Sequence, residues 1–124
     1  MEPNKNDLSI TIDGEFTQLN EYIRAERGNK YEASKIKNDE TMRAMYACYG
    51  TPEVSSYPVS ITMTWRRKDR RADPDNIAFA AKFVLDGMVA AGVLRDDGMH
   101  EISRIAHEFV IDKENQGVTV QVTA

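Results

Sequence analysis

The sequence predicts one α+β domain, in which a small mixed sheet of about four strands packs against helices. Segments with alternating apolar and polar residues lie near the start, the middle and the end of the chain, as half-buried strands do. Segments with apolar residues every three or four positions lie between them, as amphipathic helices do. The 124 residues suit a single hydrophobic core, so we expect residues 1–124 to form a single domain.

The composition is typical of a globular protein without disulfide bonds. The chain is 41% hydrophobic and 29% charged, as globular proteins are, and its single cysteine, Cys48, excludes an intrachain disulfide framework. The first residues lack the basic-then-apolar form of a signal peptide, and no apolar run reaches the roughly 20 residues that cross a bilayer. We therefore expect a cytoplasmic protein without a membrane partner. The net charge of −4 weighs mildly against a nucleic-acid-binding protein.

The first half of the chain is expected to hold one strand and two helices. Alternating residues predict a strand over 8–12. A helix is predicted over 19–27, and a second over 31–49 after a break at Gly28. In this second helix the residues with three-and-four spacing are Met42, Met45, Tyr46 and Tyr49. Two prolines, a glycine and two serines make 50–58 a loop.

The second half opens on the clearest strand pattern, over 59–65, where Val, Ile, Met and Trp alternate with Ser and Thr. One continuous helix is predicted over 74–91, with Gly92 as its stop signal. A brief extended piece is expected at 93–95. Further strands are predicted over 105–111 and 118–122, joined by a polar loop, and these last two are expected to pair as an antiparallel hairpin.

The start of the helix at 74–91 carries the residues of most chemical interest. Asp73 is a typical N-cap residue, and Pro74 suits the first helical position. At about 100° per residue, one face of the helix is apolar. The opposite face carries Asp75, Phe79, Lys82 and Asp86.

Two interpretations of these acids are open. In the first, Asp73 is a cap, Asp75 favours the helix dipole, Lys82 and Asp86 form a surface ion pair, and 96–98 is only a turn. In the second, paired carboxylates beside one proline hold a hard divalent cation such as Mg²⁺. The basic run directly ahead of the acids suits a phosphodiester substrate.

Helix geometry limits the metal site. Asp75 and Asp86 lie about 16 Å apart along the axis at 1.5 Å per residue, so they cannot bind one metal together. Asp86 is therefore interpreted as structural or as the partner of Lys82. Asp97 can join Asp73 and Asp75 only if the chain doubles back along the helix or if a second subunit supplies it.

The order of these motifs resembles the RusA-type Holliday-junction resolvases. The residues that carry the resemblance are Arg70-Arg71-Ala72-Asp73-Pro74-Asp75-Asn76, Lys82, Asp86-Gly87-Met88-Val89-Ala90-Ala91-Gly92-Val93 and Asp96-Asp97. The resemblance implies a small homodimeric endonuclease that uses Mg²⁺, with Mn²⁺ as a substitute, and no small-molecule cofactor. It implies Asp73, Asp75 and Asp97 as metal ligands and Lys82 as the catalytic lysine. The best-known members have their lysine three positions earlier, where this chain has Phe79.

We therefore expect a Mg²⁺-dependent, structure-selective endodeoxyribonuclease that resolves four-way DNA junctions by paired symmetric nicks in recombination and repair. The cations expected to contact DNA are Arg66, Arg67, Lys68, Arg70 and Arg71, with Lys30, Lys35 and Lys37 extending the track. The alternative is a catalytically inactive junction-binding or replication accessory protein, in which the acids are only a helix cap and a surface. A metal-dependent nicking assay separates these two functions.

Overall fold

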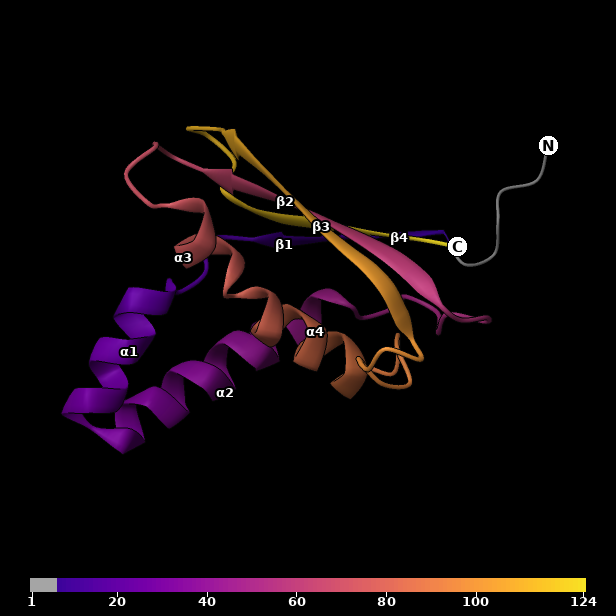
Figure 1. Ribbon diagram of the computed structural model, residues 1–124, viewed down its shortest axis with the longest axis horizontal. Coiled ribbons are helices and arrows are strands. Elements are labelled where there is room, and N and C mark those ends of the chain that lie inside the picture. Colours follow the sequence, from indigo (N-terminus) through magenta and orange to yellow (C-terminus); the bar gives the residue numbers. More distant parts are fainter. Residues whose placement is uncertain (1–6) are drawn as a thin grey trace.

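The computed structural model describes residues 7–124, which contain four strands and four helices. They follow in the order β1 (Leu8–Asp13), α1 (Leu19–Gly28), α2 (Lys30–Ala47), β2 (Val59–Arg67), α3 (Pro74–Ala78), α4 (Ala81–Ala90), β3 (Ile102–Ile111) and β4 (Gly117–Thr123). The strands form one mixed sheet, and Figure 1 shows the helices gathered on one face of it. The predicted α+β class is confirmed.

The strand order of the sheet is β1-β4-β2-β3. β4 pairs antiparallel with both β1 and β2, whereas β2 and β3 run parallel. The predicted hairpin between the last two strands is therefore wrong, because β2 lies between β3 and β4. The helical connection from β2 to β3 is a crossover that places β3 beside β2, so the following loop passes over the end of β2. The Asp112 N–H donates to the Arg67 carbonyl there, at 2.8 Å.

The hydrophobic core lies between the sheet and the helices. Alternate residues of β2 are at most 2% exposed and face the helices: Val59, Ile61, Met63 and Trp65. Their partners on β4, and the β1 residues that pair with β4 in turn, are buried in the same alternating pattern. Cys48, at the end of α2, is also buried in this core. The strand predictions are confirmed, and the burial of apolar surface supplies the main driving force for the fold.

α2 and α4 pack at unusually short range. A Cβ atom added to Gly87 would lie 2.5 Å from the Ala44 Cβ and 2.8 Å from the Thr41 carbonyl oxygen. The small side chain of Ala44, which is fully buried, is the part of α2 that faces Gly87 and permits this close approach. Tyr46 and Tyr49, which share the predicted spacing, instead point to solvent at 66% and 95% exposure. The helix was predicted correctly, whereas its apolar spacing does not mark the buried side.

The helix predicted over 74–91 is in fact two helices, α3 and α4. At the junction, the N–H groups of Ala80 and Lys82 bond to carbonyls three residues back instead of four, at 3.2 Å each. Phe79 turns there into an aromatic cluster, with ring centroids 5.4 Å from both Tyr22 and Phe83. Phe79 therefore packs inward and does not belong to the predicted charged face.

The segment after α4 also differs from the prediction. Residues 93–95 form a bend after the turn at 91–92 and not an extended piece, with Val93 and Leu94 buried at 0% and 1% exposure. The Val54 N–H donates to the Val93 carbonyl at 2.9 Å, which ties this bend to the loop before β2. No helix within residues 7–124 has the length and apolar character needed to cross a membrane.

Candidate metal and nucleic-acid site

Asp73 and Asp75 lie exposed at the start of α3. Asp73 has the extended backbone of an N-cap residue, and Pro74 follows it at the first helical position. Its side chain nevertheless makes no capping hydrogen bond. The Asp75 Oδ1 accepts the backbone N–H of Asn76 at 3.0 Å. The carboxylate of Asp73 is thus not used by the helix, so the capping interpretation holds for its backbone and not for its side chain.

Lys82 joins two acids from different elements. Its Nζ lies 3.0 Å from the Asp86 Oδ1 and 3.7 Å from the Asp97 Oδ2. The hydrogen bond to Asp86 is the largest cause that raises the pKa of Lys82, and Asp97 adds to it, while partial burial opposes both. Lys82 is therefore charged at neutral pH. The predicted Lys82–Asp86 pair is confirmed, and the chain doubles back far enough to bring Asp97 to Lys82.

The loop that carries Asp97 is held by contacts on both sides of it. Arg95 Nε lies 2.9 Å from Glu101 Oε2, and its guanidinium stacks over the Tyr57 ring at 4.3 Å. Glu101 is only 8% exposed, whereas the Arg95 side chain is 55% exposed, so the ion pair is buried on its acid side and open to water on its arginine side. Asp96 is exposed, and its Oδ1 accepts the Asp97 N–H at 2.8 Å. Of the two adjacent acids, it is Asp97 that contacts the lysine of α4.

The predicted metal ligands do not form one preformed cluster. Within residues 7–124, no three His, Cys, Asp or Glu side chains lie close enough together to hold a metal ion. The structure brings Asp97 to Lys82, while Asp73 and Asp75 stay together at the start of α3. The donor chemistry nevertheless fits the predicted ion, because Mg²⁺ prefers carboxylate oxygens and is commonly held by one or two of them.

Two of the predicted DNA-binding arginines are engaged within the fold. Arg66 donates to the Asn115 carbonyl at 2.9 Å and to the Thr119 hydroxyl, on the sheet face away from the helices. Arg67 points to the other face, because alternate residues of a strand do, and its Nε lies 3.4 Å from Glu15 Oε2. The Arg67 side chain is only 11% exposed. Arg66 and Arg67 therefore lie on different faces of the sheet, and only Arg67 also lines the grooves that the later cations of the run border.

The other three cations of the run lie beside the start of α3. Lys68 and Arg71 line a polar groove of about 570 Å³ between the β1–α1 loop and the β2–α3 loop. Arg70 lines a neighbouring groove of about 530 Å³ with Pro74 and Ile77 of α3 and the end of β3. All three are exposed, and Arg71 is 92% exposed although its Nε lies 3.8 Å from an Asp69 oxygen. The charged groups of these three cations are therefore open to solvent.

A second basic groove lies between α1 and α2. Lys30 and Lys37 line it, together with Arg27 and Tyr22 of α1, and its volume is about 560 Å³. Lys35 does not line it and instead pairs with an aspartate one turn later, at 3.2 Å. Tyr22 also packs on the aromatic ring at the α3–α4 junction, so this groove borders the junction. Sequence reasoning missed Arg27, because one sequence carries no signal for a contact between two helices.

The described residues thus combine two exposed carboxylates at the start of α3, a lysine held between two acids, and two sets of exposed cations. Carboxylate oxygens suit a hard cation, and flanking cations suit the phosphates of a nucleic acid. The arrangement is chemically able to bind a phosphodiester beside a divalent metal. No protein-family model matches the chain, and no curated protein matches it.

Proposed function

We propose that the protein is a Mg²⁺-dependent, structure-selective endodeoxyribonuclease that resolves four-way DNA junctions by paired nicks in recombination and repair. The observation that carries this proposal is the approach of the Lys82 Nζ to the Asp97 Oδ2 at 3.7 Å. These residues come from α4 and from the loop before β3, and both belong to the motifs that resemble the resolvases. A charged lysine beside an acid suits a centre that handles a phosphate.

Asp73, Asp75 and Asp97 would hold Mg²⁺, with Mn²⁺ as a substitute, and because one chain does not bring the three together, Asp97 would come from the second subunit of a homodimer. When bound, the ion supplies an activated water and stabilises charge on the leaving oxygen. Asp73 can offer both carboxylate oxygens, because the helix uses neither. Lys82 stays protonated, since its two acid partners raise its pKa, and its ammonium group offsets negative charge that develops on the substrate.

The proposed substrate is branched DNA in the cytoplasm, bound through backbone phosphates. Lys68, Arg70 and Arg71 are exposed beside the acids, and Lys30 and Lys37 line the groove of α1 and α2. Local cations can bind phosphates although the whole chain carries a charge of −4. A four-way junction has two-fold symmetry, so a homodimer would present two equivalent sites to it. No small-molecule cofactor enters this scheme.

A nicking assay on a labelled four-way junction tests the proposal. The junction is incubated with the protein in Mg²⁺ and in EDTA, and a linear duplex of the same sequence serves as the matched substrate. We expect paired nicks at symmetric positions in the junction, in Mg²⁺ only, with the duplex left intact. Tight junction binding without nicks in either Mg²⁺ or Mn²⁺ would reject the nuclease and identify the non-catalytic binding protein.

A further inference from the structure

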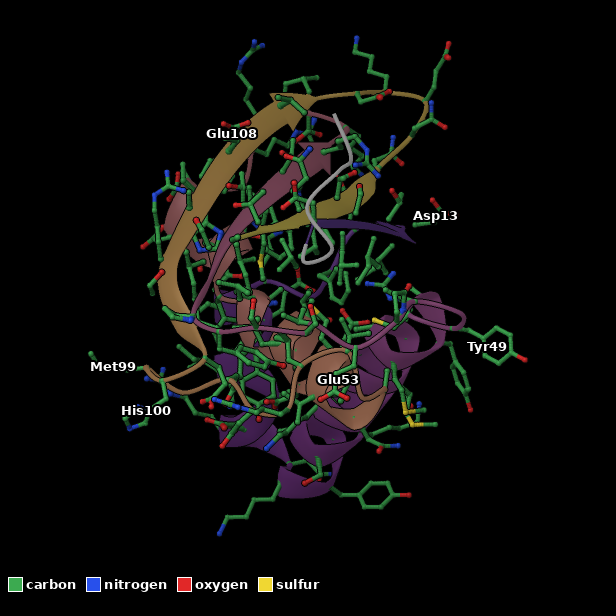
Figure 2. All side chains as sticks on the ribbon, turned by 90° about the vertical axis from the view of Figure 1, so that its right-hand side faces the viewer. Asp13, Tyr49, Glu53, Met99, His100 and Glu108 are labelled. Carbon is green, nitrogen blue, oxygen red and sulfur yellow. The ribbon has the colours of Figure 1, made fainter. Side chains whose placement is uncertain are left out.

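β3 is an outer strand of the sheet, and one of its edges is open. It has ten residues, and within residues 7–124 it pairs only with β2. Figure 2 shows β3 along the rim of the sheet, with Glu108 projecting outward from it. Natural proteins protect such edges with prolines, lysines or short strands, and β3 has no proline or lysine and is long. Its free N–H and C=O groups are available to another strand.

Apolar side chains of β3 are left uncovered as well. Ile105, Phe109 and Ile111 are exposed at 42%, 38% and 38%. They stand in register with inward-facing residues of β2, so they share the helix side of the sheet, where α3 borders Phe109 and Ile111 without covering them fully. Val110 adds a 42% exposed side chain on the opposite face. A partner strand at this edge would remove part of this apolar surface from water.

The charges of β3 complement those of a second copy of the same strand. When two identical strands pair antiparallel about a two-fold axis, the residue on the axis faces itself, and its neighbours face their counterparts in reverse order. With Ala106 on the axis, Arg104 of each copy faces Glu108 of the other. An axis at His107 sets Glu108 opposite Ala106, and an axis at Glu108 sets two acids face to face. The Ala106 register pairs opposite charges directly.

The backbone permits the same register. The Asp112 N–H points toward β2, because it donates to the Arg67 carbonyl. Backbone groups of successive strand residues point to alternate sides, so from Arg104 onward the N–H and C=O groups of the even-numbered residues of β3 face β2. Ile105 and His107 therefore direct their N–H and C=O groups to the open edge. With the axis at Ala106, these two residues face each other as a hydrogen-bonded pair. Ala106 then meets itself in the narrow pair, where a small side chain fits.

We propose that β3 binds β3 of a second copy of this chain, antiparallel about a two-fold axis at Ala106, to form one continuous sheet across a homodimer. The occupant is a second copy because the strand is complementary in charge to itself, through Arg104 and Glu108. This inference deepens the homodimer of the proposed function. Its tests measure assembly and not cleavage, so its failure and the failure of the nuclease proposal are distinguishable.

Cysteine cross-linking tests the register. Opposite residues of a narrow pair have Cα atoms about 4.5 Å apart, within the range of a disulfide. Ala106→Cys should therefore give a disulfide-linked dimer under mild oxidation, while the matched variants Arg104→Cys and Glu108→Cys, which do not face themselves, should stay single chains. Cys48 is 2% exposed and does not interfere. Cross-linking at position 108 in place of 106, or at none of the three, would overturn the proposal.

Charge reversal tests the pairing by sedimentation velocity. Arg104→Glu or Glu108→Arg alone places like charges opposite each other twice in the dimer, and should raise its dissociation constant at least about tenfold. The double reversal in one chain, or an equimolar mixture of the two single variants, should restore the dimer. Arg24→Glu and Glu53→Arg, exposed and outside β3, are the matched controls and should change nothing. A wild-type monomer at tens of micromolar, or a dimer indifferent to both reversals, would overturn the proposal.

Discussion

At the scale of single residues, the contact with Lys82 distinguishes the two acids that could belong to the candidate site. Two adjacent aspartates follow α4, and either could supply a ligand on chemical grounds. Asp97 reaches Lys82 at 3.7 Å, whereas Asp96 accepts a hydrogen bond from the backbone of its own loop. The two carboxylates therefore differ in surroundings and not in chemistry, which makes them a matched pair.

Asparagine at the two positions should have unequal effects. Asp97→Asn removes a proposed Mg²⁺ ligand and a charged partner of Lys82, and should slow nicking at least about a hundredfold, or about 2.7 kcal/mol in the barrier. Asp96→Asn should change the rate by no more than about twofold. Single-turnover nicking of a four-way junction at saturating Mg²⁺ measures both. Equal losses from the two changes would contradict the choice of Asp97.

His107 should make stability depend on pH. Trp65 Nε1 donates to His107 Nδ1 at 3.0 Å, and burial lowers the pKa of His107 below its usual 6.5. The unfolded chain then binds a proton more readily than the folded one, so this contribution is complete above pH 6.5 and is lost as the pH falls through the folded pKa. Urea unfolding between pH 7 and pH 5 should show the decline. His107→Gln keeps an acceptor for Trp65 but cannot titrate, so it should flatten the decline, and an equally steep decline would contradict this role.

At the scale of elements, local patterns could be predicted and long-range partners could not. Alternation located every strand because successive side chains of a strand point to opposite faces, and this holds even for β3, whose apolar side chains stay partly exposed. It carries no record of neighbours, so the place of β2 between β3 and β4 was missed. The helix over 74–91 was predicted to be continuous for the same reason, since the packing of Phe79 on Tyr22 joins distant parts of the chain.

The candidate site divides in the same way. Asp73, Asp75 and Lys82 lie within ten consecutive residues, so the sequence alone could single them out. The Lys82–Asp86 ion pair could be predicted for the same reason. The partners that Arg66 and Arg67 find within the fold come from residues far away in the sequence, including Glu15. Periodicity carries no information about such distant partners. The sequence alone therefore gave no sign that some cations of the run are bound within the fold while others are exposed.

The close packing of α2 on α4 should make Gly87 sensitive to substitution. Gly87→Ala would place a Cβ 2.8 Å from the Met45 backbone nitrogen, so the helices must separate, at a cost of about 1–3 kcal/mol in the free energy of unfolding. Gly28→Ala is the matched control, because nothing lies within 4 Å of its added Cβ. Urea unfolding of both variants measures the difference. A Gly87→Ala protein as stable as Gly28→Ala would show that the helices are not held this tightly.

At the scale of the whole molecule, the distribution of charge matters more than its sum. The net charge is −4, yet exposed cations line two separate grooves, one beside the start of α3 and one between α1 and α2. Cations that bind phosphates release counterions, and this gain depends on the local charges that are neutralised. The acidic total therefore does not prevent this protein from binding DNA.

Binding to a four-way junction should be sensitive to salt. Replacing Arg70 and Arg71 together by alanine should reduce the slope of log affinity against log salt by about one unit for each phosphate that is no longer neutralised. Arg24→Ala, exposed on α1 away from both basic grooves, is the control and should leave the slope unchanged. Fluorescence anisotropy in EDTA over a range of salt concentrations provides the measurement. An unaltered slope in the double variant would show that these arginines do not bind DNA.

The nuclease proposal depends on the acids at the start of α3, and Asp73→Asn tests them most directly. Asparagine caps a helix about as well as aspartate, and the Asp73 side chain makes no capping bond, so the free energy of unfolding should be unchanged or slightly raised. In one experiment, cleavage and binding of a labelled four-way junction are measured for the wild type and the variant. We predict junction binding in EDTA that is kept or tightened, and nicking in saturating Mg²⁺ that falls by orders of magnitude, each factor of ten being about 1.4 kcal/mol in the barrier. Nicking by Asp73→Asn at the wild-type rate would contradict the site.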